Sequence, residues 1–240
     1  MKMKSMSKYF IRALGCLSLL MTLNAQEAET EVKDSIVVQE KYGMRLGADL
    51  SKITRSFIGT DYMGFEINGD YRLSKRLYIA GEIGSEKKTS TNNYLSSTAK
   101  GTYLKAGVDY NMYENWAGME NLIYSGLRFG LANFNQNLNS YTIYDTNSVT
   151  WGQNEVIDNE KFSGLTSGWI ELLLGLKTEV LKNLFLGLNL QIKARLFESK
   201  PDNFENIYIP GFGRTYDSGK FSVGFGYNIS YLIPLYRKDR

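Results

Sequence analysis

The chain has 240 residues, of which 43% are hydrophobic, 13% aromatic and 22% charged, and its formal net charge is +3. It lacks the several unbroken apolar stretches of about 20 residues that a helical multi-span membrane protein needs, and its aromatic content is too high for a disordered chain. There is no histidine and only one cysteine, which excludes histidine-dependent nucleophilic catalysis and the usual zinc sites. We therefore expect a protein that is not an enzyme and that holds no cofactor or metal.

Residues 1–25 have the pattern of a secretory signal peptide. A basic start precedes the apolar segment 13–23, and Ala25 is a small residue at the expected cleavage point. The apolar segment is too short to cross a bilayer as a helix. The alternatives are a retained anchor and a lipoprotein acylated at Cys16. Cleavage would remove four of the 28 basic residues and none of the 25 acidic ones, so no basic surplus would remain for nucleic acid.

The next residues, 26–41, are acidic and mostly without pattern, and they indicate a flexible periplasmic lead-in. From residue 42 onward, apolar and polar side chains alternate. The alternation is clearest from Leu186 to Ile192, where Leu or Ile occupies every second position and Gly, Asn and Gln lie between. Side chains of a strand point alternately to its two faces, so this pattern predicts strands with one apolar and one polar face.

The alternation predicts eight strands, with a barrel over 42–236 and a charged tail over 237–240. The segments are 43–51, 62–73, 77–86, 102–112, 122–134, 168–180, 184–197 and 221–231. The apolar face runs for about 9–11 residues, the length that a tilted strand needs to cross a bilayer. The polar face mixes glycine with charges, as the lumen of a membrane barrel does. The alternative is a soluble sandwich or lipocalin-like carrier with its apolar face inward.

The connections alternate in length. The expected long segments are 52–60, 87–99, 135–161 and 198–219, and the expected short turns are 74–76, 115–118 and 181–183. Outer-membrane barrels have short periplasmic turns and long outer loops. We therefore expect an all-β, eight-stranded, antiparallel up-and-down transmembrane β-barrel in the bacterial outer membrane, assembled there by the barrel assembly machinery.

The polar face carries nearly balanced charges. An eight-stranded barrel is just wide enough for side chains, so we expect a packed, ion-paired lumen, the alternative being a narrow, porin-like conduit for a small solute. The expected lumen network consists of Arg45, Asp49, Glu66, Asp70, Arg72, Glu82, Glu86, Lys105, Asp109, Arg128, Glu171, Lys177, Glu179, Lys193 and Arg195.

The outer loops are the expected interaction surface, because loops on rigid scaffolds carry function. The candidates for glycan or protein contacts are Tyr141, Tyr144, Trp151, Tyr208 and Phe212. We expect a structural or binding role in contact with outer-membrane lipid, without nucleic acid. A histidine-free enzyme that acts on lipids or glycans is the remaining alternative.

Two segments, 61–86 and 206–236, resemble a family of uncharacterised outer-membrane β-barrel proteins from Bacteroidota, a domain of unknown function. The resemblance implies the fold and the compartment, and it carries no activity or functional residue. Many outer-membrane barrels end in an aromatic residue that the assembly machinery reads, whereas here Tyr236 is followed by the charged residues 237–240.

Overall fold

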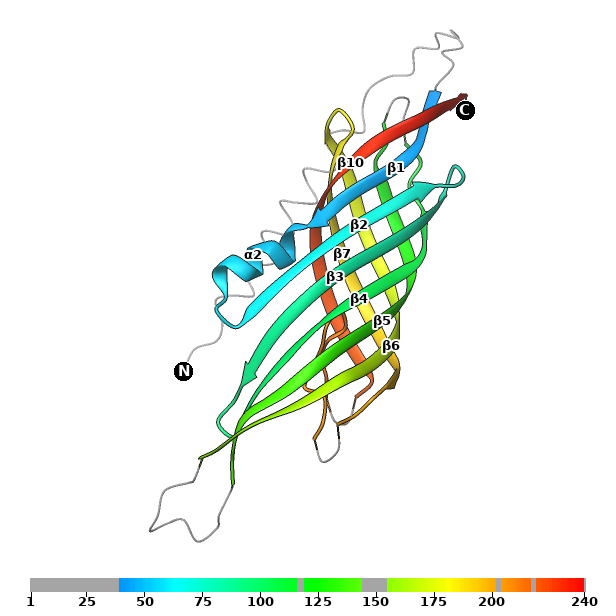
Figure 1. Cartoon of the computed structure of the whole chain (residues 1–240). Helices are drawn as coiled ribbons and strands as arrows, with labels where there is room; N and C mark the ends of the chain where they lie inside the picture. The colour runs from blue at the N-terminus through cyan, green and yellow to red at the C-terminus, as the bar shows by residue number, and fades with distance from the viewer. Residues whose placement is uncertain (1–38, 116–118, 144–154, 202–203, 217–218, 240) are drawn as a thin grey trace, which may run out of the picture. The chain divides into compact units, whose positions relative to one another are not determined.

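A computed structural model of the chain describes residues 39–115, 119–143, 155–201, 204–216 and 219–239 (Figure 1). All of them lie in one of the chain's two compact units, Val38–Arg240. The expected signal peptide and nearly all of the lead-in fall outside the described residues.

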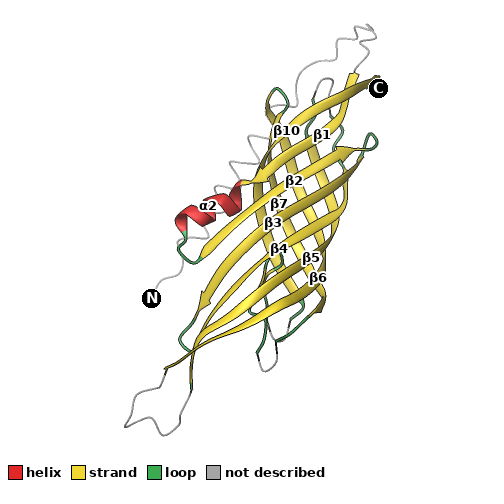
Figure 2. Ribbon diagram, viewed as in Figure 1, coloured by secondary structure: helices red, strands yellow, loops and turns green. Residues whose placement is uncertain are grey.

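Eight strands of the described chain form a closed antiparallel barrel, in the order β1-β10-β7-β6-β5-β4-β3-β2 (Figure 2). This confirms the predicted up-and-down barrel of eight strands. The barrel strands are β1 (Gln39–Asp49), β2 (Tyr62–Arg72), β3 (Leu77–Thr91), β4 (Leu95–Asn111), β5 (Leu122–Thr142), β6 (Glu155–Leu181), β7 (Leu184–Glu198) and β10 (Phe221–Asp239).

Apolar and charged side chains lie on opposite faces of these strands, as the alternation predicts. On β7, Leu188 and Leu190 are 61% and 62% exposed on the outer surface. Lys105 of β4 and Glu171 of β6 point inward and are 1% and 0% exposed. The barrel thus presents apolar side chains outside and buries charges inside, the reverse of a water-soluble barrel.

Several strands are longer than predicted. The expected long loop 87–99 is instead the continuation of β3 and β4, which pair up to Thr91 and Ser96. Pairing also extends beyond the predicted barrel ends. Lys41 of β1 lies opposite Arg237 of β10, so residues 237–239 of the expected charged tail belong to the barrel wall.

The chain after β1 differs from the prediction in kind. The expected strand 43–51 ends at Asp49, and the expected loop 52–60 is largely a helix, α2 (Leu50–Ile58). The Asp49 side chain accepts hydrogen bonds from the backbone N–H groups of Ser51 (2.7 Å) and Lys52 (3.4 Å), which caps the helix. None of the described helices is long and apolar enough to cross a membrane.

Candidate functional site

The barrel has two distinct ends. We call the end with α2 and the hairpin of β8 (Tyr208–Ile209) and β9 (Gly213–Arg214) the loop end. The opposite end, with the tight connections after β2 and β6, is the turn end.

The middle of the barrel is filled by a cluster of ion pairs around Lys105. Its Nζ lies 2.8 Å from Glu82 Oε2 and 3.6 Å from carboxylate oxygens of both Glu66 and Glu171. Arg128 extends the cluster, because it lies 3.5 Å from Glu82 and 2.8 Å from a further carboxylate, that of Asp109. Because every strand from β2 to β6 contributes a charge, this cluster ties one side of the wall together across the lumen.

A second layer lies nearer the turn end. Asp70 accepts hydrogen bonds from Arg45 Nε (2.7 Å) and Lys177 Nζ (2.5 Å). Arg72 binds Glu40 at 2.7 Å and Glu120 at 3.2 Å. Buried charges are tolerated only when they are paired in this way.

The structure brings nearly the whole predicted lumen network together. All predicted lumen residues except Asp49 take part in an ion pair, and Asp49 caps α2 instead. The partners that the alternation missed lie near the strand ends or on α2: Glu40, Lys41, Lys52, Glu120 and Glu198.

Between the two layers, a cavity of about 20 Å³ lies beside Glu66, Glu82, Arg128 and Lys177. This volume corresponds to about one water molecule. At this depth the lumen is therefore packed, with no room for a solute.

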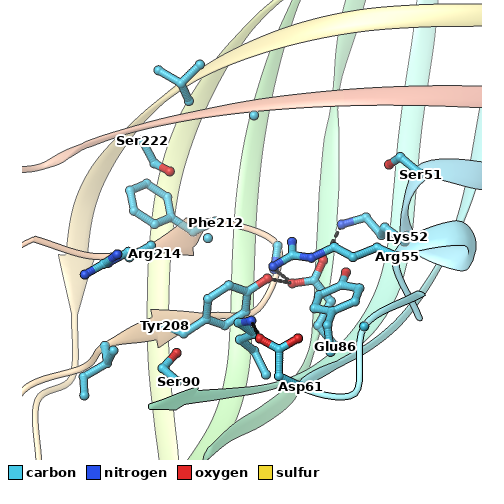
Figure 3. A pocket seen from close by; sticks show the side chains of 18 of the residues that line it. Ser51, Lys52, Arg55, Asp61, Glu86, Ser90, Tyr208, Phe212, Arg214 and Ser222 are labelled. Atoms are coloured by element: carbon cyan, nitrogen blue, oxygen red, sulfur yellow. Dashed lines mark hydrogen bonds and ion pairs between the residues drawn. The ribbon is translucent and has the colours of Figure 1, made fainter. Parts of the chain in front are cut away.

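The loop end, in contrast, holds a cavity of about 1130 Å³ (Figure 3). It is lined by the inner side of α2, by the β8–β9 hairpin, and by parts of β2, β3, β7 and β10. Figure 3 shows Lys52 and Arg55 of α2 beside Glu86 and Tyr208, with Arg214 and Ser222 on another side.

Glu86 anchors the hairpin inside the cavity. One of its oxygens pairs with Lys52, and the other accepts hydrogen bonds from Tyr208 Oη (2.7 Å) and Gly211 N (3.0 Å). Burial, and then the Glu86 charge, raise the pKa of Tyr208, so its hydroxyl stays a donor. Burial alone would lower the pKa of Lys52, but Glu86 and Glu66 raise it, so the ammonium stays charged.

The hairpin is packed into the mouth of the barrel. Phe212 is 2% exposed and its ring meets that of Trp169 edge-on, with 5.9 Å between centroids. Gly211 has a φ of +79°, and a Cβ there would lie 2.5 Å from the Tyr103 ring. Close packing and the positive φ together require glycine at this position.

The loop candidates therefore lie in different places. Tyr208 and Phe212, expected on an exposed outer loop, are buried in the barrel mouth because they fill apolar space above the lumen charges, although both line the cavity. Tyr141 is half-buried near the end of β5. Tyr144 and Trp151 lie outside the described residues.

The cavity lining carries more cations than anions. Its cations are Lys52, Arg55, Lys88, Lys193 and Arg214, and its carboxylates are Asp49, Asp61 and Glu86. Lys88 pairs with Asp61, but Arg55 and Arg214 form no ion pair within the described part of the chain. They lie instead over tyrosine rings, Arg55 at 4.0 Å from the centroid of Tyr62 and Arg214 at 5.4 Å from that of Tyr216.

The described residues contain no group of three or more His, Cys, Asp or Glu side chains that would hold a metal ion. The chemistry that the cavity offers is hydrogen bonding and attraction of anions.

Comparisons with known proteins give a family and one structural similarity. No curated protein matches the chain. The crystal structure of Ail, the attachment invasion locus protein of Yersinia pestis, is similar over 80% of this chain and 97% of that one, with 10% identity and a TM-score of 0.37. The model of a domain of unknown function, DUF6048, matches residues 6–238. Because that match covers nearly the whole chain, the protein belongs to the DUF6048 family.

Proposed function

We propose that the protein is an integral outer-membrane barrel with a sealed lumen, which binds a ligand in its loop-end cavity and does not conduct solutes or catalyse a reaction. The observation that carries the proposal is the apolar outer surface. Leu and Ile side chains on successive strands point outward, among them Ile83, Leu104, Leu127 and Leu172. Such an apolar band is unfavourable in contact with water, whereas a barrel wall in contact with the hydrocarbon of a bilayer requires it.

The ends of the barrel support an orientation. Tyr110, Tyr231 and Tyr236 are about half exposed on the outer surface near the turn end, where interfacial aromatic residues belong. Outer-membrane barrels place short turns in the periplasm. The turn end is thus the periplasmic end in this proposal, and the loop-end cavity opens to the cell exterior.

The charged layers support a sealed lumen. Lys105 and Glu171 are fully buried within ion pairs, and opening a path past them would break contacts that offset their desolvation. Both buried carboxylates of the cavity have structural partners, Asp49 in the cap of α2 and Glu86 in the anchor of the hairpin. This favours binding over catalysis.

The test uses residues 26–240, refolded and purified in detergent. We expect a folded band that migrates differently after heating, dependence on detergent for solubility, and no conductance in planar bilayers. As a positive control, the triple variant E66A/K105A/E171A removes Lys105 and two of its carboxylate partners from the central cluster and should conduct if it folds. Steady conductance of the wild type would overturn the sealed lumen. A protein that stays soluble without detergent would overturn membrane insertion in favour of a lipocalin-like carrier.

A further inference from the structure

The barrel wall has a break in its loop-end half. β1 ends where Asp49 lies opposite Asn228 of β10, and its pairing with β2 ends at Ala48 and Ile67. Beyond that point β10 continues to Phe221 and β2 to Tyr62, and no described strand lies between them. Two strands that flank a missing strand stand about 10 Å apart, and the free edge of β10 runs for about 20 Å.

The helix α2 fills only part of this break. With nine residues it is about 14 Å long, and its diameter of about 10 Å matches the missing strand. It is attached to β2, where Ser56 Oγ accepts a hydrogen bond from Gly64 N–H at 2.7 Å. α2 also contacts β10, but among the described residues no hydrogen bond joins the two. The break is therefore closed on the β2 side and loosely covered on the β10 side.

The loop-end cavity borders the break. It is lined by Ser222 and Gly224, on the inner face of β10, and also by Phe221, Val223 and Phe225, on the outer face. The last three are 68%, 77% and 73% exposed. The lining thus includes five successive residues of β10, along the edge that β1 leaves free, so the cavity reaches the break in the wall as well as the mouth.

The two sides of the opening differ in chemistry. Inside lie Arg55 and Arg214, which form no ion pair within the described chain, although the charge of Arg55 acts on Asp61 at longer range. Outside lie the aromatic and aliphatic side chains of β10 and, on α2, Phe57 and Ile58, which are 87% and 81% exposed. Guanidinium groups bind phosphate through two parallel hydrogen bonds, and an apolar surface in a membrane contacts acyl chains.

We propose that the opening between β2 and β10 admits a lipid of the outer leaflet, whose phosphate-bearing headgroup contacts Arg55 and Arg214 and whose acyl chains lie along Phe221, Val223 and Phe225. This inference rests on the proposed function, since it needs the apolar outer surface in a membrane. It defines the ligand of the cavity as an anionic amphiphile that enters sideways.

The test measures lipid retention by native mass spectrometry of the detergent-purified protein, residues 26–240. The probes are phosphatidylglycerol and phosphatidylcholine with identical dioleoyl chains, and glycerol 3-phosphate serves as a competitor without acyl chains. We expect one phosphatidylglycerol to be retained at least tenfold more tightly than phosphatidylcholine, and no competition from glycerol 3-phosphate at the same concentration.

The matched variants are R55E/R214E and K87E/K100E. Lys87 and Lys100 lie opposite one another on β3 and β4 and point outward near the loop end, so their reversal changes the charge equally outside the cavity. R55E/R214E should weaken phosphatidylglycerol binding at least tenfold, and K87E/K100E should change it less than twofold. If R55E/R214E does not fold, R55Q/R214Q replaces it, with a loss of at least threefold expected.

Three results would overturn the inference. Equal losses in the two double variants would mean nonspecific attraction to the barrel surface. Equal retention of the two lipids would mean that the headgroup does not contact Arg55 and Arg214. Displacement by glycerol 3-phosphate would indicate a site for soluble phosphates at the mouth. Each leaves the proposed function intact if the protein still shows heat-modifiable mobility, whereas loss of detergent dependence in the wild type would overturn both.

Discussion

Lys177 donates a hydrogen bond of 2.5 Å to Asp70 across the lumen and so connects β6 to β2, which are not neighbours in the barrel. The other oxygen of Asp70 accepts from Arg45 at 2.7 Å. One carboxylate thus pairs with two buried cations and links opposite sides of the barrel wall.

The first prediction concerns this carboxylate. Asp70→Asn removes the carboxylate that pairs directly with both Arg45 and Lys177, and removing one partner of a buried ion pair costs about 3–5 kcal/mol. The free energy of unfolding, from urea titration read as the heat-modifiable band, should fall by about that amount. Glu114→Gln is the control, because its pair with Arg76 is exposed to solvent and contributes little to stability. Losses of similar size in both variants would contradict a structural role for the lumen layer.

The second prediction compares two glycines. A Cβ on Gly107 would lie 1.9 Å from the carbonyl oxygen of Leu127, whereas a Cβ on Gly81 would have its nearest neighbour, the carbonyl oxygen of Lys105, at 3.6 Å. Gly107→Ala forces β4 and β5 apart and should cost about 1–3 kcal/mol of unfolding free energy, as overpacking does. Gly81→Ala should change it by less than about 0.5 kcal/mol. The same urea titration measures both, and equal effects would show that β4 and β5 are not packed this closely.

The barrel and the direction of its faces were predictable because a strand exposes alternate side chains to two environments. The sequence therefore shows apolar and polar residues with a period of two. Leu186 to Ile192 carries it without interruption, and those residues lie on β7 as expected. The extension of β3 and β4 toward Thr91 was not predictable from alternation, since Thr89, Ser90 and Thr91 are polar on both faces.

The sequence also contains a pattern that predicts the helix α2, but it overlaps the alternation that predicts a strand. Asp49 is a good N-cap, and Leu50, Ile53 and Phe57 follow with the spacing of a helix. The alternation of Met44, Leu46, Ala48 and Leu50 leads into the same residues and favours a strand there. Because α2 begins where β1 ends, the wall is incomplete beyond Asp49. The lateral opening can therefore be predicted only if the residues after Asp49 are assigned to a helix and not to a strand.

The cavity could not be predicted from the chain alone. The buried hairpin depends on contact between Phe212 and Trp169, which lie far apart in sequence and meet only when the barrel closes. The segment from Ile207 to Ile209 is apolar for an exposed loop, which was the available signal for burial. The alternation correctly placed the charged side chains of the strands inside the barrel. It did not predict α2, and so it missed Lys52, which pairs with Glu86 from that helix.

The third prediction concerns the attachment of α2. Ser56→Ala removes the hydrogen bond that Gly64 N–H donates to Ser56 Oγ, on the edge of β2 that β1 leaves free. Amide exchange at Gly64 should become at least tenfold faster, because this edge has no strand partner to protect it. Thr54→Ala, on an exposed side chain of the same helix, is the control and should leave exchange unchanged. Unchanged exchange in Ser56→Ala would mean that the helix is held in the break by other contacts.

The last prediction is a gain of binding. Asp61 lies in the connection between α2 and β2 and pairs with Lys88 at the rim of the cavity. The hydrogen bond from Lys88 lowers the pKa of Asp61, so its carboxylate is charged at every pH above its usual range near 4 and neutralises Lys88 there. Asp61→Asn removes that charge and leaves Lys88 free to attract an anionic headgroup. Phosphatidylglycerol retention should therefore increase at pH 7, by about threefold or more, in the same native mass spectrometry titration.

The pH dependence separates this effect from a general change in the protein. Below pH 4 the wild-type carboxylate begins to gain a proton, so the difference between wild type and Asp61→Asn should shrink as the pH falls through the lowered pKa. Glu114→Gln removes a carboxylate at the turn end, away from the loop-end cavity, and should leave lipid retention unchanged both at pH 7 and below pH 4. An equal gain in Asp61→Asn and Glu114→Gln would mean that overall charge, and not the cations around the opening, governs lipid binding.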